Sequence, residues 1–149
     1  MDAVAAYLKD WLITYLKNRN IEKIEEKGET VLVQYKDRDV TFYVRPFIKD
    51  FAEFAHQKKG TAIVVFNAKE NLDAVFSSWK GIKENKLITI YFVNPLSTLE
   101  TKWILAPYTH DRVSDVATLK QGLKSMFEMV EPLTKEQAEK QMKAKSDKA

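Results

Sequence analysis

Two short, almost continuously apolar segments constrain the fold of this chain most strongly. They are Ala62–Phe66 and Leu87–Val93, and such runs are typical of strands covered on both faces. A helix is predicted between them from Asn71, because apolar residues recur there at the spacing of one helix face: Leu72, Val75, Phe76, Trp79 and Ile82. A strand, helix, strand unit of this length favours a right-handed crossover between parallel strands. We therefore expect a sheet whose two central strands run parallel.

The N-terminal third predicts a helix followed by an antiparallel meander. Apolar residues from Val4 to Tyr15 form one stripe of a helix over about Asp2–Asn18. Three segments then alternate β-branched or aromatic residues with polar ones, and short turns separate them: Ile21–Lys27, Thr30–Lys36 and Asp39–Pro46. The alternation leaves one face of this meander wetter than the other.

The remaining segments add helices and one strand. A short helix is predicted over Phe47–Lys58, a strand over Lys102–Ala106 and a helix packed on the sheet over Ser114–Glu131. Thr134 and Gln137 form a capping box for a last helix. That helix has few apolar residues, so we expect a single globular domain over 1–132 and a solvated, lysine-rich helix or tail over 133–149.

Composition limits the chemistry and the location. The 149 residues include no cysteine, which excludes disulfides, thiolate metal sites and thiol nucleophiles. The sequence has no signal peptide and no apolar run of the roughly 18 residues that a membrane span needs, so we expect a cytoplasmic protein without membrane contact. The net charge is +3, and the surplus of lysine after residue 134 accounts for most of it. Total charge therefore identifies no partner.

The order of elements resembles the PD-(D/E)xK, or restriction-endonuclease-like, superfamily over roughly Asp2–Ala106. The resemblance rests on topology, and it implies an α/β fold with a mixed sheet: an antiparallel meander, a crossover helix, a parallel strand and flanking helices. By this resemblance Asp39 corresponds to the metal-binding aspartate, Asn67 to the second acidic ligand and Lys69 to the motif lysine. Asp10 corresponds to the acidic residue that some members carry on the first helix.

Asn67 is the departure that matters most, because an amide does not supply the negative charge of a carboxylate. Mg²⁺ is held by carboxylates and waters, so Asp39 with Asn67 makes a poor metal site unless Glu70 takes the place of the missing carboxylate. The simpler interpretation is structural, with Asn67 leading into a loop and capping the next turn and Lys69 solvated. We predict no metal and no cofactor, and Mg²⁺ would bind only if the degenerate site is active. We expect that the protein is not an enzyme rather than that it is one.

A second group of candidates could bind phosphate. Arg45, Lys69 and Arg112 would form an anion-binding cluster if their strand ends converge, and His110 lies next to Arg112 in a segment, 108–112, that we expect to be a loop. Each has a structural alternative. Arg45 would pair with Asp50 or Glu53 of the neighbouring helix, and Asp111 with Ser114 or Asp115 would cap the helix that follows.

Other motifs are few. Tyr35, Phe42 and Tyr43 could stack on bases if the wetter face of the meander were exposed, although such aromatic side chains are more often core. His56 and His110 lie too far apart in a chain without cysteine to favour a zinc site. Two hypotheses remain. One is a protein that binds or processes DNA or RNA on a nuclease-like scaffold with lost or impaired cleavage, and the other is a non-enzymatic module that forms a homodimer or holds a protein partner.

Overall fold

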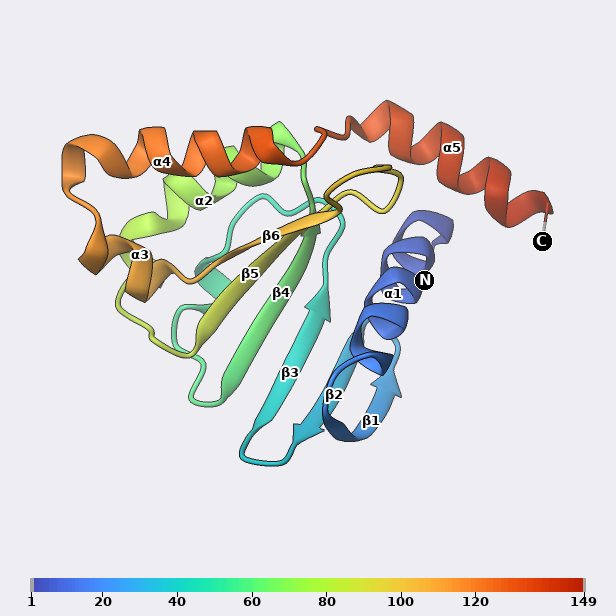
Figure 1. Ribbon diagram of the computed structural model, residues 1–149, viewed down its shortest axis with the longest axis horizontal. Helices are drawn as coiled ribbons and strands as arrows, with labels where there is room; N and C mark the ends of the chain where they lie inside the picture. Colours follow the sequence, from blue (N-terminus) through green and yellow to red (C-terminus); the bar gives the residue numbers. More distant parts are fainter. Residues whose placement is uncertain (1, 149) are drawn as a thin grey trace.

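The computed structural model describes residues 2–148 and places one six-stranded sheet between two layers of helices (Figure 1). The strands lie in the order β1-β2-β3-β4-β5-β6. In chain order the elements are α1 (Ala3–Lys17), β1 (Ile21–Lys27), β2 (Thr30–Tyr35), β3 (Asp39–Val44), the 3₁₀ turn η1 (Ala52–Phe54), β4 (Gly60–Phe66), α2 (Lys69–Ile82), β5 (Ile88–Val93), β6 (Lys102–Leu105), α3 (Pro107–Val113), α4 (Val116–Met129) and α5 (Lys135–Lys148).

The two apolar segments are parallel neighbours, as predicted. Thr61 of β4 lies opposite Ile88 of β5, and Phe66 lies opposite Val93. Strand β3 also runs parallel to β4, whereas β1, β2 and β3 form the predicted antiparallel meander and β6 returns antiparallel to β5. The fold is therefore mixed α/β. We call the end of the sheet at which β3, β4 and β5 begin the amino edge, and the opposite end the carboxyl edge.

Each face of the sheet carries its own core. On one face α1 buries Leu8, Leu12 and Leu16 against Phe42 and Val64 of the strands. On the other face α2, the segment around η1 and α4 pack over the parallel strands. The buried side chains of this face include Phe51, Leu72, Val75, Ile82 and Leu123. The sheet thus lies between α1 with α5 on one side and the remaining helices on the other (Figure 1).

The C-terminal helix differs from the expected solvated tail. The capping box forms as predicted, with Thr134 N donating to Gln137 Oε1 and Gln137 N donating to Thr134 Oγ1. However, Ala138 and Met142 of α5 are completely buried in the core beneath α1. These side chains are one helical turn apart, so they face the same way and dock the helix although its other positions are polar.

Two further predictions of local structure were wrong. The segment 47–58 contains only the turn η1 instead of a helix, because side chains of α2 bind its backbone: Ile48 N donates to Asn71 Oδ1 and Phe51 N donates to Ser78 Oγ. The segment 108–112 is part of the helix α3 instead of a loop. The predicted helix at 114–131 is α4, capped by the Asp115 side chain. None of the helices within residues 2–148 is long and apolar enough to cross a membrane.

Candidate functional site

The positions that the nuclease resemblance singles out do not meet. Asp39 begins β3 at the amino edge and is exposed, whereas Asn67 directly follows β4 at the carboxyl edge. By the strand register Asp39 lies level with Lys59, eight residues before Asn67, which corresponds to roughly 26 Å at about 3.3 Å per residue. Lys69 and Glu70, exposed at the start of α2, lie with Asn67. The prediction that Asp39, Asn67 and Lys69 form one degenerate site is therefore wrong in its geometry.

Asn67 is a structural residue, and its amide fastens α4 to the sheet. Its side chain is fully buried. The Nδ2 group donates to the carbonyl oxygens of Phe127 and Val130, at 3.0 and 2.9 Å, and Oδ1 accepts a 2.7 Å bond from the indole nitrogen of Trp103. Asn67 thus satisfies carbonyls at the end of α4, which no helical N–H can reach. It does not cap the turn that follows it, where α2 begins after Ala68 without a side-chain cap.

Two more buried asparagines close the carboxyl edge. Asn71 donates to the carbonyl oxygens of Pro46 and Phe66, both at 2.9 Å, and accepts from Ile48 N. Asn94 follows β5 and donates to Glu131 O at 2.8 Å. In parallel α/β sheets this edge commonly holds the ligand. Here Asn67, Asn71 and Asn94 are all bound to groups of the protein itself.

The predicted phosphate-binding set is divided between the two edges. Arg45 and Lys69 lie at the carboxyl edge, where Arg45 pairs with Glu29 at 3.6 Å and not with Asp50 or Glu53. His110 and Arg112 belong to α3, which follows the end of β6 at the amino edge. The expected cluster of Arg45, Lys69 and Arg112 is therefore not formed.

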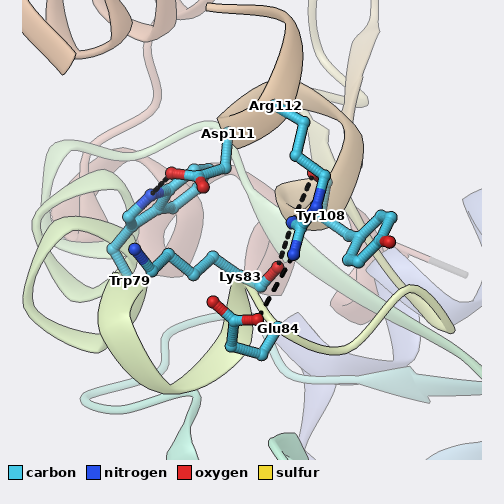
Figure 2. A network of polar contacts seen from close by, with 6 residues as sticks. All are labelled: Trp79, Lys83, Glu84, Tyr108, Asp111 and Arg112. Carbon is cyan, nitrogen blue, oxygen red and sulfur yellow. Dashed lines mark hydrogen bonds and ion pairs between the residues drawn. The ribbon is translucent and has the colours of Figure 1, made fainter. Parts of the chain in front are cut away.

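The polar groups of α3 fasten this helix to α2 (Figure 2). Arg112 lies 3.4 Å from the ring centre of Tyr108 and donates to Lys83 O and to the Glu84 carboxylate. Asp111 accepts a 2.9 Å bond from Trp79 Nε1, so it does not cap the next helix. His110 Nδ1 lies 3.1 Å from the backbone nitrogen of Ala106, within its own helical turn. These contacts account for the polar side chains of the 108–112 segment without a catalytic arrangement.

Basic side chains are concentrated at the amino edge. Five segments meet there: 17–20, 36–39, 56–60, 83–87 and 107–114. Together they carry nine lysines and arginines against four acidic residues, namely Lys17, Arg19, Lys36, Arg38, Lys58, Lys59, Lys83, Lys86 and Arg112 against Asp37, Asp39, Glu84 and Asp111. The segments at the carboxyl edge (28–29, 45–50, 67–70, 94–101 and 130–135) carry four basic and five acidic residues. The two edges of the sheet therefore differ in the sign of their charge.

An aromatic pocket opens at this basic edge, on the face of the sheet that carries α1. Its volume is about 250 Å³. The lining residues come from β2 to β5 and their preceding turns, and no acidic residue is among them: Tyr35, Arg38, Val40, Phe42, Gly60, Thr61, Ala62, Lys86, Leu87, Thr89 and Tyr91. The pocket therefore combines ring surfaces, hydroxyl groups and two cations. We refer to it below as the aromatic pocket.

The pocket exists because small residues lie between large ones. Across the sheet, Tyr35 at the end of β2 and Tyr91 on β5 are three strand spacings apart, roughly 14 Å. Along the strands, Tyr91 lies level with Val64 and is therefore further from the amino edge than Tyr35. Between these strands β4 contributes Gly60 and Ala62, whose small size leaves the space that forms the pocket. A Cβ at Gly60 would lie 2.9 Å from the backbone oxygen of Asp39, so the start of β4 has no room for a larger residue.

Both tyrosines are half-buried and have neutral hydroxyl groups at physiological pH. Burial raises the pKa of Tyr91 well above the ordinary value, and burial also raises the pKa of Tyr35. The guanidinium of Arg38 lies 4.7 Å from the centre of the Tyr35 ring and is also 3.5 Å from the exposed carboxylate of Asp37. The phenol groups can thus donate hydrogen bonds next to a positive charge.

Sequence reasoning identified only part of this pocket. Tyr35 and Phe42 were candidates for base stacking on the wetter face of the meander, but they point toward the α1 face, and Phe42 is buried at the pocket floor. Tyr91, Thr89 and Lys86 were missed, because nothing local in their segments distinguishes them. The sequence signal for the pocket is the small size of Gly60 and Ala62 in a strand whose other residues are mostly large and apolar.

Comparisons of the chain with protein-family models, with curated proteins and with solved structures found no match. Among the side chains that the structure describes, no three of His, Asp or Glu lie together so that they could hold a metal ion.

Proposed function

We propose that this protein binds nucleic acid at the amino edge of its sheet and holds it without cleaving it. The observation that carries the proposal is the surplus of five positive charges in the segments of this edge, next to the aromatic pocket. Neutralising phosphates requires Lys and Arg gathered on one surface, whatever the total charge of the chain. The net charge of the whole chain, +3, does not reveal this local surplus of positive charge.

Several of these cations are available to a ligand. Among the described residues, Lys58, Lys59 and Lys86 are exposed and form no ion pair within 4 Å. They lie on neighbouring turns, because Gly60 and Thr61 follow one turn and Ile88, the partner of Thr61, follows the other. Three flexible lysines on adjacent turns suit contacts to successive phosphates.

The absence of cleavage is supported by the role of Asn67. Its donors and its acceptor are all bound within the protein, and Asp39 lies at the other end of the sheet. A phosphate held near Lys58 and Lys86 would therefore be far from the position that the nuclease resemblance assigns to the second metal ligand.

The test is the salt dependence of binding to labelled oligonucleotides, compared between two matched double variants. Lys58→Gln/Lys86→Gln removes two charges at the amino edge, and Arg45→Gln/Lys69→Gln removes two at the carboxyl edge. We expect the first variant to weaken binding and to lower the slope of log affinity against log salt by about 1 for each lost phosphate contact. The second variant should bind like the wild type. Equal losses in both, or no binding by the wild type, would contradict the proposal.

A second candidate is a protein-interaction module, favoured by a groove on the uncovered face of the meander. The groove has a volume of about 460 Å³, with Leu32 and Thr41 beside two basic and two acidic residues: Lys23, Lys59, Glu25 and Asp39. Balanced charge of this kind suits a protein surface better than a polyanion. A salt-indifferent dimer seen by light scattering, together with no retention of DNA or RNA, would favour this candidate over nucleic-acid binding.

A further inference from the structure

The aromatic pocket has the proportions of a site for one flat ring system. Its volume of about 250 Å³ lies just below the roughly 300 Å³ at which pockets for drug-sized ligands begin. Tyr35 on β2 and Tyr91 on β5 both line it, and the buried side chains of Phe42 and Ala62 lie between these strands. The Tyr91 ring packs 5.6 Å from the ring of Phe42, so the two rings form one aromatic surface. A planar group inserted here would contact ring surface and leave water.

The polar groups of the pocket suit a base that carries a phosphate. Thr89 and Tyr91 line it. The Thr89 hydroxyl donates to Thr61 O at 3.5 Å and keeps its acceptor lone pairs. Arg38 and Lys86 stand among the lining residues, from the β2–β3 turn and from the turn before β5. No carboxylate lines the pocket, and the exposed Asp37 that pairs with Arg38 lies outside the lining. The site therefore accommodates an anion and offers hydroxyl groups to the edge of a base.

We infer that the aromatic pocket takes one unpaired base of a single-stranded nucleic acid, with the adjoining phosphates on Arg38 and Lys86. This inference rests on the proposed function and specifies its substrate class. A paired base is already stacked within its helix and is not free to enter a pocket between two tyrosines, whereas an unpaired base can be splayed out onto aromatic side chains. Single strands are therefore preferred over duplexes of the same sequence.

Three variants distinguish the pocket from its surroundings. Thr89→Phe fills the pocket and leaves all its aromatic residues and charges in place. Tyr91→Leu removes one ring wall. Tyr7→Leu is the matched control, because Tyr7 is a half-buried tyrosine of α1 that lies outside the five segments of the amino edge and does not line the pocket. Circular dichroism and the melting temperature establish that each variant is folded before binding is measured.

The experiment uses the full chain and a short oligothymidylate that carries one 2-aminopurine, alongside the same strand with an abasic site at that position. With the wild type we expect the 2-aminopurine fluorescence to change on binding and the abasic strand to bind about tenfold more weakly, since it lacks one stacked base. Thr89→Phe should bind both strands alike, without the fluorescence change. Tyr7→Leu should behave like the wild type. If Tyr91→Leu is unfolded, Thr89→Phe alone tests whether a base enters the aromatic pocket.

The outcomes separate this inference from the function on which it rests. If the wild type binds duplex and single strand equally with a steep salt dependence, or if Thr89→Phe keeps the fluorescence change, the base pocket is refuted and nucleic-acid binding stands. If neither strand binds at low salt, the proposed function is refuted, and the base pocket with it. A preference for single strands of tenfold or more that Thr89→Phe abolishes supports both.

Discussion

The indole nitrogen of Trp103 donates a 2.7 Å hydrogen bond to the side-chain oxygen of Asn67, whose amide nitrogen donates in turn to the last turns of α4. This position needs an acceptor and a donor on one short side chain. Asparagine provides both, whereas an ionised aspartate only accepts. The amide at the end of β4 is therefore what the local packing requires.

Restoring the carboxylate should damage the protein without creating a nuclease. In Asn67→Asp the carbonyl oxygens of Phe127 and Val130 lose their donor and face a buried negative charge, which should lower the free energy of unfolding by about 3–5 kcal/mol. Urea denaturation measures this loss. With Mg²⁺ present we expect no cleavage of DNA or RNA, because Asp39 lies at the far edge of the sheet. A folded, Mg²⁺-dependent Asn67→Asp nuclease would show that the two positions do cooperate.

The docking of α5 should depend on one large side chain. Met142 is fully buried, so Met142→Ala should weaken the contact with α1 by about 2 kcal/mol or more. The helix would then open more often, and trypsin should cut within 135–148 faster than in the wild type. Gln141→Ala, at the exposed neighbouring position, is the control and should be cut at the wild-type rate. Equal cleavage of both variants would mean that Met142 does not hold the helix.

Acid should weaken the attachment of the 47–54 segment to α2. Hydrogen bonds from Ala52 N and Ser78 Oγ, at 2.7 and 2.9 Å, hold the pKa of Asp50 below its ordinary value of 3.8. Because this pKa is lower in the folded state than in the unfolded state, the Asp50 carboxylate contributes its full stabilisation above about pH 4. The stabilisation is lost as the pH falls through the folded-state pKa. The melting temperature of Asp50→Asn should therefore lie below that of the wild type at pH 7 and approach it near pH 3.

The same comparison offers an internal reference. Hydrogen bonds from Thr118 to Asp115 at the start of α4 also lower the pKa of the Asp115 carboxyl group. The melting temperature of Asp115→Asn should therefore also lie below that of the wild type at pH 7 and approach it as the pH falls to 3. A constant difference between wild type and Asp50→Asn from pH 7 to pH 3 would show that the Asp50 carboxylate does not contribute through its charge.

Local patterns were enough to predict most of the fold. Continuous apolar runs identified β4 and β5, and alternation identified the meander, because strand burial determines both patterns. The pattern failed for 47–58, where helical spacing of Phe47, Phe51 and Phe54 was present but Asn71 and Ser78, more than 20 positions later, bind the backbone. It also failed for α5, since two buried side chains are too few to form a recognisable stripe.

The site was less predictable than the fold, because its partners are distant in sequence. The carbonyls that bind Asn67 lie 60 and 63 positions away, so a motif centred on residues 67–69 contained no information about them. The aromatic pocket depends on four strands and on the small size of Gly60 and Ala62 between two tyrosines. Sequence order could suggest Tyr35 as a stacking residue, but only the strand register shows that Tyr91 faces the same hollow.

An NMR titration determines whether nucleic acid binds at the amino edge of the sheet. Amide resonances of a ¹⁵N-labelled sample are followed while an unlabelled oligothymidylate is added. We predict that the largest shifts fall at residues 36–39, 58–61 and 86–91, while residues 45–47 and 67–71 at the carboxyl edge stay in place. Shifts concentrated at 45–47 and 67–71, with the amino edge unchanged, would show that nucleic acid does not bind at the amino edge.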